Sequence, residues 1–348
     1  MSGSVKAGGG FSPGRLVTPS GDAPSFTDAA DVLKHALPPV PDEEVPGLLL
    51  LADGSRFEGL LFGARESAEG ELVFTTGMTG FQESLTDPSF AGQVLTFTYP
   101  LIGNYGVHLG RSESAGIWPR GVVVRHAMRN PDHRDSVAGI DEFLRAHGVT
   151  GIEAIDTRAV TRRVREHGTL LCVIGAASDE RSLKQRLAEL TPPDLEDLVN
   201  EVSLDEPILL NPGFNAPRLA ALDCGIKYNI LRELCRRFEV LWCPPDIAYE
   251  KLVSDWNIDA MFCSNGPGDP AHHGKATAAR MTIAEAVSRG MPTMGICLGH
   301  QLLGLACGLT TYKMRYGHRG ANQPVLDLLS RTVAITSQNH GFAVEDPE

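Results

Sequence analysis

The sequence lacks the features that mark membrane, secreted and nucleic-acid-binding proteins. It has no apolar run of about 18 residues, which a membrane-spanning helix needs, and its first residues, MSGSVKAGGGFSPG, have no apolar stretch typical of a secretory signal. It also has no Lys/Arg-rich run, and 31 basic against 43 acidic residues give a formal net charge of -12. Nucleic-acid-binding proteins have the opposite charge pattern. We therefore expect a cytoplasmic protein that binds neither membranes nor nucleic acid.

Paired cysteines and metal-ligand patterns are also missing. The seven cysteines stand singly, without a Cys-x-x-Cys pair, and their number is odd, which argues against a disulfide scaffold and a cysteine zinc site and fits a reducing compartment. His272 and His273 are adjacent, without further ligands at metal-binding spacing, so we predict a loop there and no metal site in the chain. The glycine-rich KAGGGFSPG segment lacks the Lys-Ser/Thr pair of a phosphate-binding loop, so we place no ATP site in this chain.

The first part of the chain has the pattern of a β-rich domain that follows a polar extension. Residues 1–45 are rich in Gly, Pro, Ser and Asp, a composition that predicts a flexible extension. In residues 46–192, an Asp-Gly pair within LLLLADGSRFEGLLFGA predicts a hairpin. Further strands are indicated in GELVFTTG, GQVLTFTYP and GVVVR, and helices in VAGIDEFLRAHG and DTRAVTRRVREHG. Residues 193–216 have several prolines and little periodicity, so we predict a connector.

Residues 217–348 begin with a strict alternation of strand and helix patterns. Buried-strand patterns occur in RLAALDCG, FEVLWCP, IDAMFCSN and PTMGIC, and each is followed by a helical pattern. This alternation predicts an α/β domain with an open, mostly parallel sheet that is covered on both faces, and it predicts ligand binding at the carboxyl ends of the strands. Cys297 and the SNGPGDP loop both lie at such ends.

The segment PTMGICLGHQ raises the question of why a cysteine should stand between two glycines directly after a strand. Gly295 and Gly299 flank Cys297 with the spacing of the Gly-x-Ser-x-Gly nucleophile elbow, in which a sharp strand-to-helix turn presents the nucleophile. A helix N-terminus can lower the pKa of a thiol, and we expect this effect at Cys297. The N–H of Leu298, the residue after the nucleophile, is placed to donate to a developing oxyanion.

The SNGPGDP loop is the candidate for the second oxyanion donor. Gly266 and Gly268 allow backbone conformations that other residues avoid and let a substrate approach the main chain. Two alternatives stay open when each feature is taken alone: Gly-Pro-Gly is common in ordinary turns, and Cys297 would also fit a buried structural thiol. The occurrence of both features at neighbouring strand ends favours a catalytic site.

Several long segments resemble one family. GICLGHQLLGLACG and SNGPGDP resemble the nucleophile and oxyanion segments of the class I, or triad, glutamine amidotransferases. FTTGMTGFQESLTDPSFAGQVLTFTYPLIGNYGV, GIEAIDTRAVTRRVREHG and LDCGIKYNILREL resemble segments of the small, glutamine-hydrolysing subunit of carbamoyl-phosphate synthetase. The likeness extends from about residue 46 onward.

The resemblance implies a reaction, its site and a partner. Cys297 would attack glutamine, the N–H groups of Gly266 and Leu298 would hold the oxyanion, and ammonia would pass to a large subunit. That subunit would use ATP and Mg to make carbamoyl phosphate for arginine and pyrimidine biosynthesis, while this chain itself would hold no cofactor. The residues that the resemblance places around glutamine are Gly266, Gly268, Leu298, Gln301, Asn339, Gly341 and Phe342. Gly77 joins them, although it stands where the family usually has a small hydroxyl residue.

The sequence also departs from the family beyond HGFAVEDPE. The family continues to a GHPE-like segment that supplies a catalytic histidine and an orienting glutamate, and residues 1–348 contain neither, so we expect a longer protein. Three other histidines could be considered as the base. His340 is the nearest to the expected glutamine site, although the family treats it only as a neighbour, and His300 and His318 fit structural or solvated positions better.

Two alternative functions are therefore retained. One is another triad amidotransferase, against which the MTGFQESLTDPSF segment argues. The other is a non-catalytic binding or regulatory subunit that retains the glutamine pocket without turnover.

Overall fold

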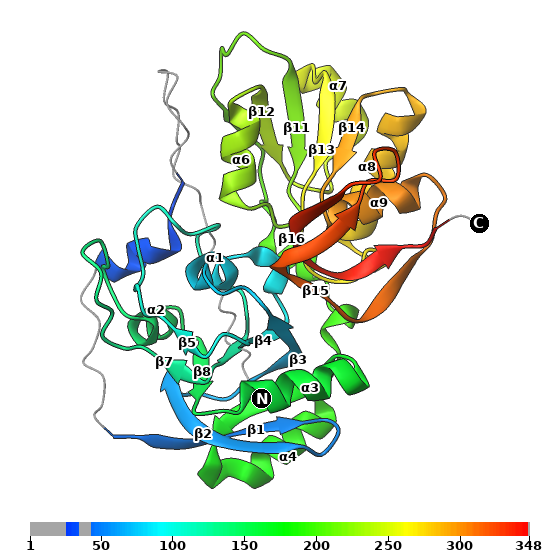
Figure 1. Ribbon diagram of the computed structural model, residues 1–348. Coiled ribbons are helices and arrows are strands. Elements are labelled where there is room, and N and C mark those ends of the chain that lie inside the picture. Colours follow the sequence, from blue (N-terminus) through cyan, green and yellow to red (C-terminus); the bar gives the residue numbers. More distant parts are fainter. Residues whose placement is uncertain (1–25, 35–42, 347–348) are drawn as a thin grey trace, which may run out of the picture.

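Seven strands of the N-terminal half close into a barrel in the computed structural model, which describes residues 26–34 and 43–346. The order around the barrel is β1-β2-β8-β6-β4-β3-β9, and Figure 1 shows the barrel unit in the lower half of the view. The strands are β1 Val45–Leu51, β2 Arg56–Gly63, β3 Ala68–Thr75, β4 Gln93–Phe97, β6 Gly121–Val123, β8 Thr150–Glu153 and β9 Leu170–Ala176. The predicted Asp-Gly turn joins β1 and β2, which pair antiparallel, and Gly54 takes a φ of +86° there.

Short helices pack around the barrel. They are α1 Phe81–Leu85, α2 Ile140–Ala146, α3 Thr157–His167, α4 Glu180–Glu189 and the 3-10 helices η2 Pro88–Phe90 and η3 Ala177–Asp179. Val160 and Val164 of α3 pack with barrel residues such as Leu72 and Ile174, and Leu183 of α4 covers Leu48 on the outside. Two short strands, β5 Leu101–Ile102 and β7 His126–Ala127, form a separate parallel pair.

The C-terminal half contains the predicted parallel sheet, with strand order β10-β12-β11-β13-β14. Its strands are β10 Ile208–Leu210, β11 Arg218–Leu222, β12 Glu239–Cys243, β13 Ala260–Cys263 and β14 Thr293–Gly295. Its helices are α5 Leu198–Val202, α6 Tyr228–Cys235, α7 Tyr249–Trp256, α8 Lys275–Ser288 and α9 Leu298–Ala306. Strand residues alternate between two cores, with Leu219 and Ala221 packing against α6 and Ala220 and Leu222 on the side of α7 to α9.

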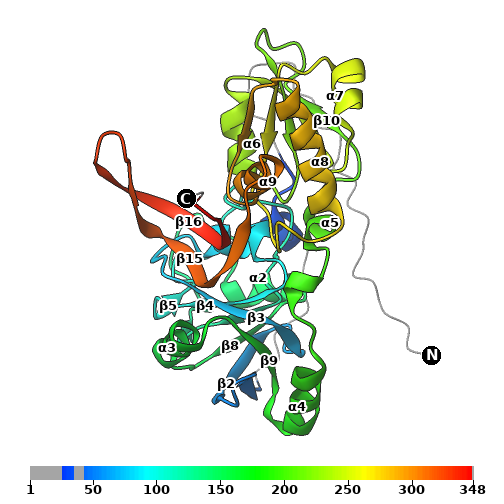
Figure 2. The same cartoon turned by 90° about the vertical axis from the view of Figure 1, so that its right-hand side faces the viewer.

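A long antiparallel hairpin follows α9. Its strands, β15 Thr311–Leu326 and β16 Val333–Val344, pair with each other and not with the parallel sheet. Figure 2 shows the hairpin projecting from the molecule beside the junction of the two units. Its far end is exposed, with Leu328 and Leu329 80% and 98% exposed, whereas its near end contacts α9 and β3.

The structure differs from two of the predicted boundaries. Within the predicted flexible extension, residues 26–34 are packed: Ala29 and Ala30 of the 3-10 helix η1, Ala29–Lys34, are buried, and Phe26 stacks on Tyr228 with ring centroids 4.5 Å apart. The rest of that extension, residues 1–25 and 35–42, lies outside the described residues. The predicted connector contains the 3-10 helix η4 Pro193–Leu195, α5 and β10. Because β10 pairs antiparallel with β12, this segment supplies the edge of the sheet.

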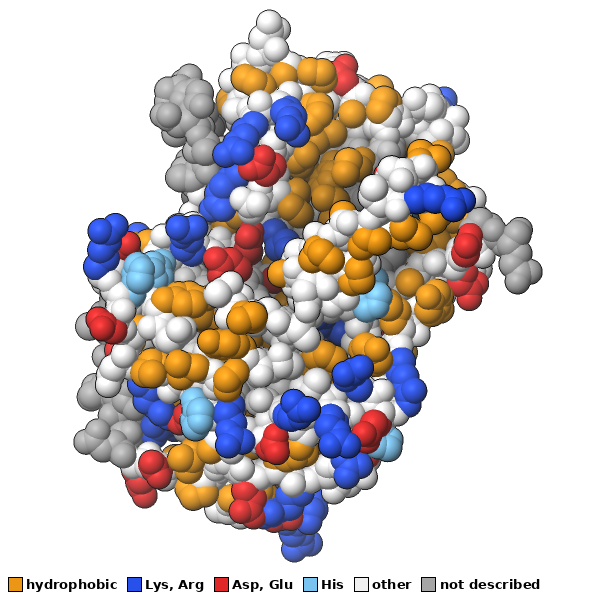
Figure 3. Space-filling model, in the orientation of Figure 1, with side chains coloured by type: hydrophobic (Ala, Val, Ile, Leu, Met, Phe, Trp, Pro, Cys, Tyr) orange, Lys and Arg blue, Asp and Glu red, His pale blue; other side chains and the backbone are white. Residues whose placement is uncertain are grey.

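The helices and one face of the surface bear on the expectations about membranes and nucleic acid. None of the helices within residues 26–34 and 43–346 is both long and apolar enough to cross a bilayer. On the face drawn in Figure 3, basic and acidic side chains are interspersed, and hydrophobic side chains gather beside the hairpin. The expected absence of nucleic-acid binding stays a prediction.

Candidate active site

The turn between β14 and α9 holds Cys297 in a strained backbone conformation. Cys297 is the N-cap of α9 and has φ +54° and ψ -112°, a combination that is costly for any residue with a side chain. A Cβ on Gly295 would lie 2.3 Å from the carbonyl of Gly299, and a Cβ on Gly299 would lie 2.0 Å from the carbonyl oxygen of Cys263. Both flanking positions therefore require glycine, and the predicted nucleophile-elbow geometry is present.

Two backbone N–H groups point at the sulfur of Cys297. The N–H groups of Leu298 and Gly266 both donate toward this sulfur and lower its pKa. Gly266 must be glycine because a Cβ there would lie 2.0 Å from the carbonyl oxygen of Cys224. Two converging N–H donors beside a nucleophile are the arrangement that stabilises an oxyanion.

The thiol itself is held in its neutral form. Cys297 Sγ donates a hydrogen bond of 3.2 Å to the carbonyl oxygen of Asn339. Burial and the nearby Asp87 carboxylate raise the pKa of Cys297 to about 11, against the opposing effects of the Leu298 N–H, Lys227 and the Gly266 N–H. The expectation that the helix N-terminus gives Cys297 a lowered pKa is wrong for this structure, because burial outweighs the backbone donors.

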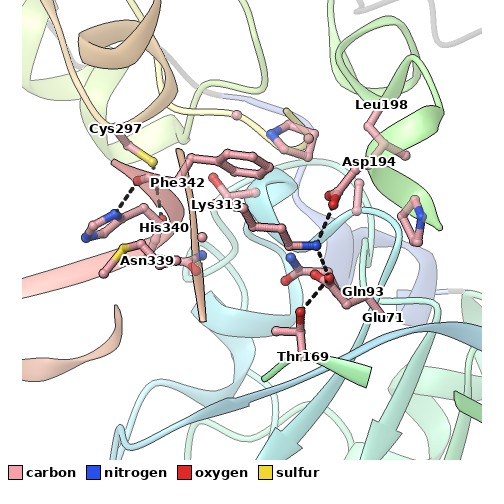
Figure 4. A pocket seen from close by; sticks show the side chains of 18 of the residues that line it. Glu71, Gln93, Thr169, Asp194, Leu198, Cys297, Lys313, Asn339, His340 and Phe342 are labelled. Atoms are coloured by element: carbon pink, nitrogen blue, oxygen red, sulfur yellow. Dashed lines mark hydrogen bonds and ion pairs between the residues drawn. The ribbon is translucent and has the colours of Figure 1, made fainter. Parts of the chain in front are cut away.

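Most of the predicted site residues meet in one pocket between the barrel, the parallel sheet and the hairpin (Figure 4). The predicted residues that line it are Gly266, Gly268, Cys297, Gln301, Asn339, Gly341 and Phe342. Leu298 reaches the site through its N–H group. Loop, helix and hairpin therefore contribute to one cavity, although they come from separate parts of the sequence.

Hydrogen bonds fix the two predicted amide side chains in this pocket. Gln301 is buried in α9, and its Nε2 donates to the carbonyl oxygen of Phe342 at 2.7 Å. Asn339 Nδ2 donates to Asp87 Oδ2 at 3.1 Å. Gly268 has a φ of +84°, which explains glycine at this turn.

The structure does not bring Gly77 into the Cys297 pocket. Gly77 lines a separate small pocket beside Tyr105, and its N–H donates to Thr75 Oγ1 at 3.3 Å. The neighbouring residue Thr76 connects this segment with the hairpin, because its N–H donates to the carbonyl oxygen of Arg319 at 3.2 Å. The assignment of Gly77 to the site is thus not supported by its position.

None of the three candidate histidines is hydrogen-bonded to Cys297 in the part of the chain that the structure describes. His340 lines the pocket, but its Nδ1 interacts with the carbonyl oxygen of Phe342 at 2.8 Å and its Nε2 with Gln338 Oε1 at 3.1 Å. His318 Nδ1 lies 3.0 Å from the same Gln338 oxygen, and His300 is exposed. Burial lowers the pKa of His340.

Asp87 and Lys227 were not identified from the sequence. Asp87 precedes η2 of the barrel unit, Lys227 is the N-cap of α6, and their charged groups approach to 3.6 Å. The Asp87 carboxylate contributes most to raising the pKa of Lys227, and Glu113 raises it further. Both residues occur in segments quoted above, but no local pattern predicts a contact between two units of a fold.

One group of possible metal ligands lies away from Cys297. Single ligand atoms of His108, His133 and Asp135 lie within 4.8 Å of one another, and two of these residues are exposed. His272, in the loop predicted to bind no metal, interacts through Nε2 with the carbonyl oxygen of Leu195 at 3.3 Å. The prediction that the chain has no metal site stays a prediction.

Comparisons with known proteins place the chain in a family. The family model for the carbamoyl-phosphate synthase small chain, CPSase domain, matches residues 49–174, and the model for glutamine amidotransferase class-I matches residues 220–348. The carbamoyl phosphate synthase small chain of Chlorobaculum tepidum is 43% identical over 310 residues, which cover 87% of this chain and 83% of that protein. The chain belongs to the carbamoyl phosphate synthase small-chain family.

Other similar proteins support this family assignment, and the matched region covers very different shares of their lengths. The small chain of Methanopyrus kandleri is 44% identical over 306 residues, or 86% of this chain and 82% of that protein. The "Multifunctional protein CAD" of Squalus acanthias is 43% identical over 307 residues, which are 85% of this chain but only 13% of that protein. The predicted family, enzyme class and mixed α/β fold with a class I amidotransferase domain are confirmed. All seven cysteines are free thiols in the structure.

Proposed function

We propose that this chain hydrolyses glutamine to glutamate and ammonia at Cys297. The observation that carries the proposal is the strained turn at Cys297, with the N–H groups of Leu298 and Gly266 directed at its sulfur. A nucleophile on a sharp turn with two backbone donors is suited to acyl transfer from an amide. The family to which the chain belongs supports glutamine as the amide.

The chemical steps follow from this geometry. The thiolate of Cys297 forms a bond to the carboxamide carbon, and the carbonyl oxygen becomes an oxyanion held by the N–H groups of Leu298 and Gly266. The carbon–nitrogen bond then breaks, and the nitrogen leaves with a proton as ammonia. Water attacks the thioester, restores the thiol and releases glutamate.

The first step requires that the Cys297 thiol lose its proton. With a pKa of about 11 and a hydrogen bond to the Asn339 carbonyl, the thiol is overwhelmingly protonated at neutral pH. A general base must therefore reach Sγ, and among residues 26–34 and 43–346 no imidazole does so here. General acid–base assistance is worth typically ~10²–10⁴-fold, so turnover depends strongly on this group.

We further propose that the ammonia is used by a large subunit. In this proposal the large subunit binds ATP and Mg and makes carbamoyl phosphate, which serves arginine and pyrimidine biosynthesis, and the small chain itself needs no cofactor. The proposal is supported by relatives that are named as small chains of carbamoyl phosphate synthase. A cytoplasmic location is part of the same proposal.

The test is ammonia release from glutamine, with and without the large subunit, for the unaltered chain and for Cys297→Ser. We expect ammonia and glutamate in equal amounts from the unaltered chain with the large subunit, and none above background from the variant. Equal release by both chains would contradict the assignment of Cys297.

A second candidate function is favoured by the neutral, hydrogen-bonded thiol. If the large subunit binds the chain and the chain binds glutamine, yet no glutamate forms, the chain acts as a binding or regulatory subunit. Glutamine binding without glutamate formation would support this alternative over the glutaminase.

A further inference from the structure

A buried arginine on the hairpin faces the Cys297 pocket without a carboxylate partner. Arg319 of β15 is only 4% exposed and lines the same pocket as Cys297. One of its terminal nitrogens donates to the carbonyl oxygen of Tyr316 at 2.6 Å, while its Nε is buried without a hydrogen-bond partner. Buried charges in folded proteins are normally paired, so an unpaired guanidinium calls for a ligand.

The acidic groups of the pocket are already neutralised by another residue. Lys313 forms ion pairs with both Glu71 and Asp194, and Thr169 Oγ1 donates to Glu71 at 2.8 Å. Figure 4 shows this group on the side of the pocket away from Cys297. Among the described residues, no carboxylate lies within ion-pair distance of Arg319. The anion that pairs with Arg319 must therefore come from outside these residues.

The position of Arg319 matches one end of an amino acid substrate. Arg319 pairs directly with Asn339 across the hairpin, so their side chains leave the same face. Cys297 Sγ bonds to the carbonyl of Asn339, and a Cβ on Gly341 would lie 3.3 Å from a terminal nitrogen of Arg319. Strands rise about 3.3 Å per residue, so Gly341 lies roughly 7 Å beyond Asn339, a span that extended glutamine can bridge.

We infer that Arg319 binds the α-carboxylate of the glutamine whose carboxamide lies at Cys297. This inference rests on the proposed glutaminase function and adds a residue that selects the substrate. A guanidinium can donate two parallel hydrogen bonds to a carboxylate, which fixes orientation as well as affinity. Arg319 thereby favours a free amino acid over an amide that has the ammonium but no carboxylate, such as 4-aminobutyramide, which is glutamine without its α-carboxylate.

The experiment is a double-mutant cycle between protein and ligand, measured as binding so that it does not depend on turnover. Glutamine and 4-aminobutyramide are each titrated into the full chain carrying Cys297→Ala, with Arg319 either intact or changed to Gln. A ligand that binds too weakly for direct titration is measured by its competition with glutamine. We expect Arg319→Gln to raise the Kd of glutamine about 10–100-fold and that of 4-aminobutyramide less than about 3-fold. Removing the carboxylate and the guanidinium together should therefore cost at most about 3-fold more than removing the carboxylate alone.

Arg315→Gln is the matched control, because Arg315 is on the same strand but its guanidinium bonds the carbonyl of Glu166 outside the pocket. This variant should bind both ligands like the parent. Arg319→Lys, which keeps the charge but loses the planar fork, should show an intermediate loss with an unchanged thermal midpoint. Equal weakening of both ligands by Arg319→Gln, or no weakening of glutamine, would overturn the inference. Absence of glutamine binding with Arg319 intact would instead overturn the glutaminase proposal itself.

Discussion

Four neighbouring parallel strands each bring a cysteine to the same edge of the sheet, but the end of β14 differs from the ends of β11, β12 and β13. Cys224, Cys243 and Cys263 are completely buried, and the sulfurs of Cys224 and Cys263 lie 3.8 Å apart. Cys297 is partly exposed and is the one of the four with a positive φ.

The comparison shows that a raised pKa does not by itself distinguish a candidate nucleophile from a packing thiol. The pKa of Cys224 is raised by its hydrogen bond with Cys263 and by burial, and that of Cys243 by burial. The pKa of Cys297 is raised as well, but there two N–H groups and Lys227 oppose the burial. Backbone conformation and converging donors therefore distinguish Cys297 from the three packing thiols.

The largest effect should come from the nucleophile itself. Cys297→Ser is expected to lower glutamine-dependent ammonia release at least ~10³-fold, because the alkoxide is far less accessible than the thiolate. Cys243→Ala, which removes a thiol from the end of β12, should retain release within about a few-fold. The rates are compared at saturating glutamine with the large subunit present, and similar losses in both variants would contradict the distinction between the two strand ends.

The second effect concerns the glycine that permits the turn at β14. Gly299→Ala places a Cβ against the carbonyl oxygen of Cys263, 2.0 Å away, and should lower the free energy of unfolding by about 2 kcal/mol or more. Gly116→Ala is the control, because nothing lies within 4 Å of its Cβ position, and we expect a change of less than ~0.5 kcal/mol. Urea unfolding of the two variants measures the difference, and equal midpoints would disprove the close approach.

The third effect is a loss of stability at alkaline pH. Burial raises the pKa of Cys235 to about 12 and that of Cys297 to about 11, whereas unfolded thiols titrate near ~8.5. Between these values the folded chain binds more protons, so the free energy of unfolding falls with rising pH, by up to about 1.4 kcal/mol per unit for each thiol. Below about pH 8 these thiols should cause no change. Urea unfolding from pH 7 to 10.5 checks the slope, and Cys235→Ala should reduce it.

The smallest effect tests the charges around Cys297. Because the Asp87 carboxylate raises the pKa of Cys297 and the Lys227 ammonium lowers it, Asp87→Asn should speed alkylation of Cys297 by iodoacetamide at pH 9, and Lys227→Gln should slow it. We expect changes of about 2–5-fold, because each variant removes one of several groups that act on this thiol. Peptide mass spectrometry follows the reaction, with exposed Cys307 as the internal reference. Shifts of the same sign in both variants would contradict this electrostatic account.

Local patterns predicted much of the fold and part of the site. The helices and strands from β11 to α9 follow the predicted segments, because alternating and helical periodicity reflect burial within each segment. The turn at Cys297 was predicted from two glycines and one cysteine. The sequence did not reveal the packing of residues 26–34, the edge strand β10 or the hairpin β15–β16. These features depend on partners that are distant in sequence, such as Phe26 with Tyr228.

The amino-acid sequence by itself determined the turn at the proposed nucleophile, its glycine neighbours and the parallel sheet, because these depend on local backbone sterics and on the burial of nearby residues. The protonation of Cys297 and the placement of Gly77, Asp87, Lys227 and Arg319 were decided by the tertiary structure. Desolvation and Coulomb interactions depend on distances between segments, and these distances exist only after the barrel, sheet and hairpin have packed together.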